Sequence, residues 1–121
     1  MTRRPKLQTD SGSDISIVLD SMTEMFSYYD LSLRVRWTNR AAAESVGLTV
    51  EEMAGRHCYE LWQGRSSPCP GCPVLKAKKS KQPREAVMAT PDGRVWRLRA
   101  HPVFGPKGEL IGLTEFGLDV T

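Results

Sequence analysis

Apolar and polar residues alternate along the last third of the chain, which is the period-two pattern of half-buried β-strands. In segment 95–103 the two faces carry different side chains: Trp96, Leu98 and Ala100 on one, and Arg97, Arg99 and His101 on the other. The turn Pro91-Asp92-Gly93 precedes this segment, and a turn over 105–108 follows it. The pattern therefore predicts three strands, over 84–90, 95–103 and 110–118, joined by hairpins.

The first half of the chain predicts a hairpin followed by short helices. Segments 25–29 and 33–37 are strand candidates, and Val35 and Trp37 alternate with arginines in the second. Asn39 can cap a helix that ends at Gly47, and Thr49 begins a capping box. Pro73 suits the first turn of a helix that runs to about Ser80. The expected fold class is α+β, a five-stranded antiparallel sheet with short helices on one face.

The N-terminal region predicts an arm followed by an amphipathic helix. Residues 1–12 are mostly charged or polar, so we expect a disordered arm or linker before one domain over 13–121. Apolar residues then recur at helical spacing: Ile15, Val18, Leu19 and Met22. Their face either packs on its own domain or forms a homodimer with a second copy, and the sequence leaves both interpretations open.

Composition narrows the function classes. A chain of 121 residues with 40% hydrophobic and 26% charged residues suits one globular domain. No apolar run is long enough to span a membrane, and no signal core follows the basic start, so we expect a cytoplasmic domain without membrane contact. The net charge of +3 is too small and dispersed to predict nucleic-acid binding.

Several motifs, in their order along the chain, resemble the PAS family of sensory domains. The segment 37–42 is similar to the second strand and Asn-capped helix of that family, and 51–56 is similar to the following small helix. The segment 91–96 looks like its fourth strand, and 108–112 like its last. Asp119-Val120-Thr121 looks like the Asp-x-Thr exit from which PAS domains signal into the next module.

The resemblance implies a binding and signalling module that is not itself an enzyme. The cysteines at 58–73 resemble those of a PAS subgroup found in bacterial and archaeal sensor histidine kinases. A PAS domain of this kind serves a two-component signal-transduction protein, with a downstream kinase or regulator domain in the same parent chain. The family encloses a ligand pocket between sheet and helices, and the pocket residues expected here are Trp37, Trp96, Leu98 and Glu115. A pocket that stays empty would instead indicate a ligand-free protein interaction module.

Three cysteines and a histidine form the one site-like cluster of the sequence: His57, Cys58, Cys69 and Cys72. Thiolates and imidazole suit zinc or an iron–sulfur cluster, which gives a metal-binding hypothesis. Cys72 precedes a predicted helix, whose dipole would lower its thiol pKa and favour redox sensing with Cys69. A third interpretation is that the cysteines are simply small buried apolar residues.

Haem and flavin are not expected as cofactors. Haem-binding PAS sensors use a histidine on the helix that corresponds to 73–80, and this segment has none. Segment 55–61 resembles the cysteine loop of the flavin-binding LOV subgroup, but His57, Tyr59 and Glu60 depart from it. No phosphate-binding loop or nucleophile elbow is present, so we expect no catalysis by the domain.

Overall fold

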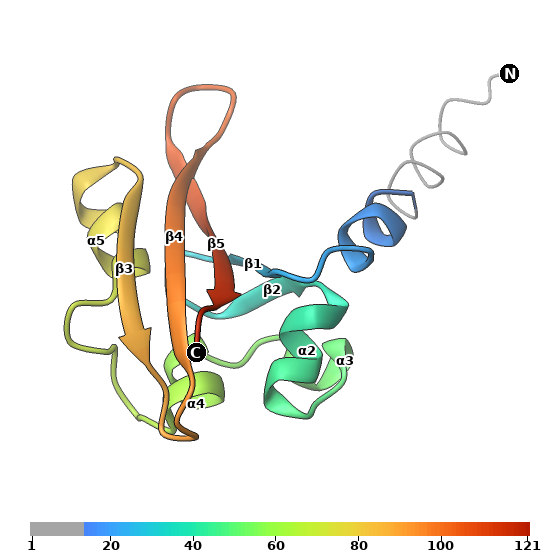
Figure 1. Cartoon of the computed structure of the whole chain (residues 1–121). Helices are drawn as coiled ribbons and strands as arrows, with labels where there is room; N and C mark the ends of the chain where they lie inside the picture. The colour runs from blue at the N-terminus through green and yellow to red at the C-terminus, as the bar shows by residue number, and fades with distance from the viewer. Residues whose placement is uncertain (1–13) are drawn as a thin grey trace, which may run out of the picture.

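The computed structural model describes residues 14–121, and its centre is one antiparallel sheet (Figure 1). Its order is β2-β1-β5-β4-β3, so the N-terminal hairpin lies beside the C-terminal strand. The strands are β1 (Met25–Tyr29), β2 (Val35–Thr38), β3 (Arg84–Ala89), β4 (Val95–Phe104) and β5 (Leu110–Asp119). The predicted α+β class with a five-stranded antiparallel sheet is confirmed.

Short helices cover one face of this sheet. They are α2 (Arg40–Val46), α3 (Val50–Met53), α4 (Cys58–Gln63) and α5 (Pro73–Ser80). Helix α2 packs on β1, α3 on β2, and α5 on the other three strands. The predicted ends of α2 are confirmed, since Asn39 caps it and Gly47 ends it with the left-handed backbone that glycine tolerates. The capping box of α3 at Thr49 is confirmed as well.

Helix α4 was not predicted, although the sequence carries a signal for it. The Glu60 carboxylate accepts a hydrogen bond from the backbone N–H of His57 at 3.0 Å, as in the reciprocal half of a capping box. Gly64 then ends the helix in the left-handed region. The residue pair three apart and the following glycine are the features that would have identified this helix.

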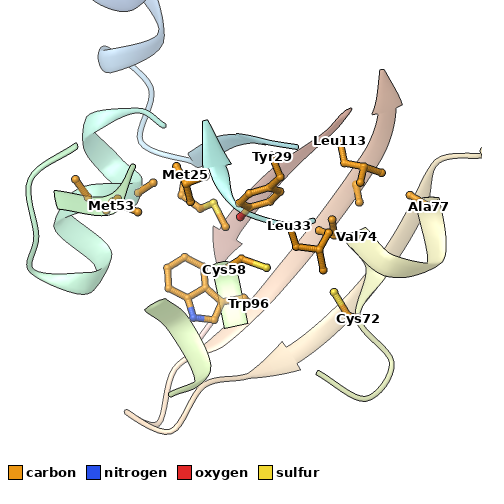
Figure 2. Close-up of a cluster of buried hydrophobic side chains, with 14 residues drawn as sticks. Met25, Tyr29, Leu33, Met53, Cys58, Cys72, Val74, Ala77, Trp96 and Leu113 are labelled. Atoms are coloured by element: carbon orange, nitrogen blue, oxygen red, sulfur yellow. The ribbon is translucent and has the colours of Figure 1, made fainter. Parts of the chain in front are cut away.

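The core lies between the sheet and the helices. On β1 the side chains of Met25, Ser27 and Tyr29 point to the helices, and Phe26 and Tyr28 point away. The register pairs Ser27 with Glu115, which places the Glu115 side chain on the helix-covered face of β5. Figure 2 shows Met25, Tyr29, Cys58 and Trp96 in this buried cluster. Strand alternation therefore decides which residues of β4 and β5 meet the helices.

A bulge in the first hairpin corrects one expected pocket residue. The pairing of β1 with β2 shifts between Tyr28 and Tyr29, so Val35 is buried in the core while Trp37 pairs with Tyr28 on the opposite face. There the Trp37 ring lies 5.7 Å from that of Phe26, measured between centroids. The expectation that Trp37 lines the pocket was wrong, because the extra residue reverses the alternation.

The N-terminal helical segment covers residues 14–20 and projects away from the sheet (Figure 1). Its exposed apolar side chains are Ile15, Ile17 and Val18, whereas Leu19 and Met22 are half-buried. The expected arm over 1–12 lies outside the described residues. Within residues 14–121, no helix combines the length and apolar character needed to cross a membrane.

The buried Asn39 side chain ties three parts of the fold together. Its Oδ1 accepts hydrogen bonds from the backbone N–H groups of Phe26 and Ala42, both at 3.0 Å. Its Nδ2 donates to the carbonyl oxygens of Leu19 at 3.1 Å and Glu24 at 3.0 Å. One side chain thus joins the start of α2 to β1 and to the segment that follows the N-terminal helix.

We expect Asn39→Ala to lower the free energy of unfolding by about 3 kcal/mol, because it leaves several buried backbone groups without partners. The matched control is Thr49→Ala at the exposed cap of α3, which should cost about 1 kcal/mol. Urea denaturation of both variants measures the difference. Equal losses in the two would show that Asn39 acts only as an ordinary helix cap.

Candidate functional site

A cavity of about 50 Å³ lies between the sheet and helices α4 and α5. Its walls are mainly apolar and contain five sulfur-bearing side chains: Met25, Cys58, Cys69, Cys72 and Met88. Three aromatic side chains also line it, from Tyr59, Trp62 and Trp96. Since one water molecule occupies about 30 Å³ in the liquid, the cavity holds only a very small group.

The inner end and the mouth of the cavity differ in burial. Trp96, Cys58 and Glu115 are buried at the inner end. The half-buried side chains of Tyr59, Gln63, Cys69 and Met88 form the rim, on α4, the following loop and β3. A larger molecule would therefore enter from the rim and place one end against the buried residues.

Glu115 is the one acidic side chain of the cavity wall among residues 14–121. Its Oε1 accepts a hydrogen bond of 2.7 Å from the Tyr29 hydroxyl, and both residues are buried. Burial raises the pKa of the Glu115 carboxyl to about 7, although the bond from Tyr29 acts in the opposite direction. The carboxyl group can thus gain or lose a proton near neutral pH. Trp96 and Leu98 line the same cavity as Glu115.

The three cysteines meet at the cavity, but their chemistry differs from the redox expectation. Cys58 and Cys72 are buried, Cys69 is half-buried, and all three are free thiols. Burial raises the pKa of each thiol. At Cys72, backbone N–H groups of the first turn of α5 lower the pKa less than burial raises it, so the expected lowering was wrong. Protonated thiols are poor nucleophiles, which weakens the redox hypothesis.

The expected metal ligands do not converge. His57 lies outside the cavity wall, stacks on Tyr59 with ring centroids 4.7 Å apart, and has its Nδ1 3.3 Å from Glu60 Oε1. Within the described part of the chain, no three side chains of His, Cys, Asp or Glu are arranged to hold a metal ion. The residues present therefore do not fit a zinc or iron–sulfur site.

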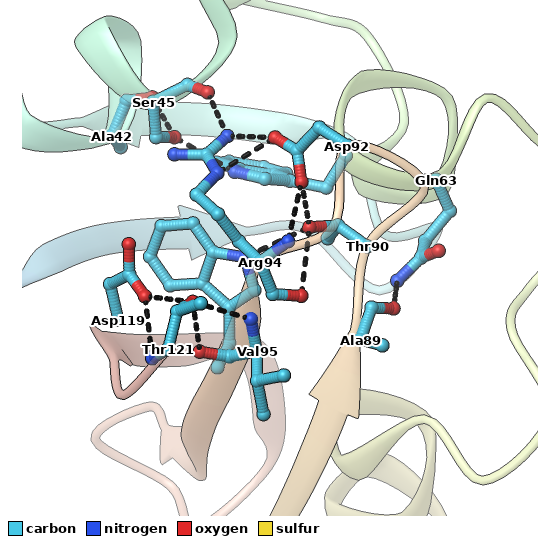
Figure 3. A network of polar contacts seen from close by, with 12 residues as sticks. Ala42, Ser45, Gln63, Ala89, Thr90, Asp92, Arg94, Val95, Asp119 and Thr121 are labelled. Atoms are coloured by element: carbon cyan, nitrogen blue, oxygen red, sulfur yellow. Dashed lines mark hydrogen bonds and ion pairs between the residues drawn. The ribbon is translucent and has the colours of Figure 1, made fainter.

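Arg94 connects the cavity walls to helix α2 (Figure 3). Its guanidinium group pairs with Asp92 at 2.6 Å and donates to the backbone carbonyl of Ser45. The Ser45 hydroxyl accepts a bond of 2.9 Å from Trp62 Nε1, and the guanidinium lies 4.8 Å from the ring centroid of Trp96. Because Trp62 and Trp96 also line the cavity, a change in their positions would alter their contacts with Ser45 and Arg94. The sequence analysis did not predict this network.

Residues 119–121, at the end of β5, are attached to the first residue of β4. The backbone N–H of Val95 donates to Thr121 Oγ1 at 2.8 Å, and the Val95 carbonyl accepts from the Val120 N–H at 2.9 Å (Figure 3). The Thr121 N–H donates to Asp119 Oδ1 at 2.9 Å. The end of the chain is thus bonded to the residue between Arg94 and Trp96.

Comparisons with known proteins agree with this architecture. The family model described as the PAS fold matches residues 19–121. No curated protein sequence matches the chain at a significant level. The solved structures described below are 15–21% identical to the chain, so they bear on its fold alone.

Three solved structures illustrate the likeness. The PAS domain of a protein from Colwellia psychrerythraea has a TM-score of 0.71 at 15% identity, with 90% of this chain and 96% of that chain covered. The PAS domain of Bordetella pertussis BvgS has a TM-score of 0.65 at 16% identity, covering 92% and 86%. VqmA of Vibrio cholerae, in a complex with ligand and DNA, has a TM-score of 0.66 at 21% identity, with 88% of this chain and 50% of that chain covered.

We expect the Glu115 carboxyl to make the fold less stable as pH rises. Its pKa is about 7 in the folded chain against 4.5 for an ordinary carboxyl, so the folded state binds more protons between these values. The free energy of unfolding should fall by about 3 kcal/mol from pH 4.5 to pH 7 through this group. Urea denaturation of wild type and Glu115→Gln at pH 5 and pH 8 measures the contribution of this carboxyl group to the pH dependence of stability.

The matched control is Glu44→Gln, which should keep the wild-type slope because Glu44 is exposed on α2 and does not line the cavity. If Glu115→Gln kept that slope too, the buried carboxyl would not be its source.

Proposed function

The chain belongs to the PAS-fold family of sensory and signalling modules, and from that premise we propose that it binds a small molecule in the cavity and signals its presence to an attached regulator. The observation that carries this proposal is the cavity itself, apolar at its walls and with one buried carboxyl group at its inner end. A few polar groups in an apolar pocket are typical of small-molecule sites.

The hydrogen-bond network supports a route for the signal. Trp96 lines the cavity, and its neighbour Val95 bonds to Thr121 at the end of the last strand. A ligand that favours one position of Trp96 would thereby favour one arrangement of the exit, which is a shift between populations of two states. The regulator proposed to receive the signal is a sensor histidine kinase or related two-component protein of the cytoplasm, with the domain itself non-catalytic.

Two alternatives have unequal support. The thiol and metal functions at Cys58, Cys69 and Cys72 are disfavoured by the raised thiol pKa values and by the position of His57. A ligand-free interaction module is supported by the small volume of the cavity, about 50 Å³. The ligand-binding and interaction functions make different predictions for a variant that fills the cavity.

Leu98→Phe should abolish ligand binding, since the larger side chain occupies the cavity that Leu98 lines. We expect members of a fragment mixture to shift the amide NMR signals of Trp96, Val95 and Thr121 in wild type but not in this variant. The matched control is Val87→Phe, on the exposed opposite face of the adjacent strand, which should leave the shifts unchanged. Shifts that persist in Leu98→Phe, or that avoid these residues in wild type, would contradict the proposal.

We further propose that the domain forms a homodimer through its N-terminal helix. Of the predicted interface residues, Ile15 and Val18 are exposed, and the exposed Ile17 joins them. Leu19 and Met22 are half-buried, and the Leu19 backbone carbonyl accepts a hydrogen bond from Asn39 Nδ2. Exposed apolar side chains on adjacent turns are a contact that a second copy can bury symmetrically.

The double substitution Ile15→Ser and Val18→Ser should convert a dimer to a folded monomer, as measured by light scattering. The single substitution Leu31→Ser removes an exposed apolar side chain elsewhere and should leave the mass unchanged. An unaltered mass of the double variant would exclude this helix as the interface.

A further inference from the structure

The cavity wall contains an acidic side chain and, among residues 14–121, no basic one. Among residues 14–121, no Lys, Arg or His lines it, while Glu115 is buried at its inner end. The titratable groups that face this carboxyl are the Tyr29 hydroxyl on β1, the Cys58 thiol on α4, and the Cys69 and Cys72 thiols before α5. None of these groups carries a positive charge in any protonation state, so an ionised Glu115 has no counter-charge in the cavity wall formed by the described residues.

The walls around the carboxyl group are suited to a cation. The Trp96, Trp62 and Tyr59 rings line the same space, and aromatic faces attract organic cations. The ring of Trp96 already accepts the Arg94 guanidinium at 4.8 Å from its centroid, and Arg94 is not part of the cavity wall. The polarisable sulfur atoms of Met25 and Met88 add favourable contacts for such a group.

We propose that the cavity binds a small organic ammonium compound, with Glu115 as its counter-charge and Trp96, Trp62 and Tyr59 as its aromatic walls. This inference rests on the proposed function and specifies its ligand class. The small volume limits what reaches the inner end to a cationic head of few heavy atoms, and the half-buried rim leaves a path for an alkyl tail. The hydroxyl of Tyr29 would hold the carboxylate in place as the ligand enters.

The proposal predicts a definite pH dependence. Only the ionised carboxyl pairs with an ammonium group, and the pKa of Glu115 in the free domain is raised to about 7. Affinity should therefore be greatest above pH 7 and fall as pH decreases through that value, by roughly tenfold between pH 8 and pH 6. A neutral ligand that accepts a hydrogen bond from the protonated carboxyl would show the opposite trend.

Three probes of similar length separate charge from size: n-butylammonium, n-butanol and n-butyrate. Titration of the domain at pH 8, followed by the amide NMR signals of Trp96 and Leu98, should show saturable binding of n-butylammonium only. Glu115→Gln should weaken that binding at least tenfold, and the exposed Glu60→Gln should change it less than twofold. The pH series on the wild-type domain tests the same point without a variant.

The outcomes distinguish this inference from the proposed function. The ammonium inference is overturned if n-butanol binds as tightly as n-butylammonium, or if Glu115→Gln binds n-butylammonium with unchanged affinity. In either case, binding that Leu98→Phe abolishes would still support a ligand-binding cavity. If none of the three probes shifts Trp96 or Leu98, the ammonium inference is also overturned, and the fragment mixture then decides the proposed function separately. Affinity that rises toward pH 6 would likewise overturn it.

Discussion

The hydrogen bond from Tyr29 to Glu115 joins neighbouring strands at the centre of the sheet, and both the packing and the cavity depend on it. Burying an ionised carboxyl group without a charged partner destabilises the folded state. The hydrogen bond from Tyr29 and the raised pKa, which keeps the group protonated at lower pH, reduce that destabilisation. The same property serves the proposed function, because a group that the protein solvates poorly is one whose protonation state a bound molecule would change. Under that proposal, stability and binding are linked at one side chain.

Most helices and strands could be predicted because local sequence signals specify them. Asn39, Thr49 and Pro73 act on the few residues that follow them, and the turn at Pro91-Asp92-Gly93 pairs adjacent strands, so short-range patterns sufficed for these elements. Trp96 and Leu98 could be placed on the inner face for the same reason, since an unbroken strand alternates regularly.

Features set by long-range pairing could not be predicted in this way. The bulge that turns Trp37 to the outer face lies in the pairing of β1 with β2, and no pattern within β2 alone indicates it. The cysteines were recognised as a cluster, but burial governs their pKa values, and burial depends on how α4 and α5 pack against the sheet. The Arg94 network likewise joins residues 49 positions apart.

The division of the cavity into a fixed inner end and a half-buried rim has a consequence for evolution. Glu115 is constrained by its strand neighbours and by Tyr29, so its replacement affects folding as well as recognition. Met88 and Tyr59 at the rim are only half-buried, so their side chains are less constrained by packing. Under the proposed function, substitutions at the rim would change which ligand tails fit while the anchoring carboxyl stays the same, which is a route to new specificities that leaves the buried core intact.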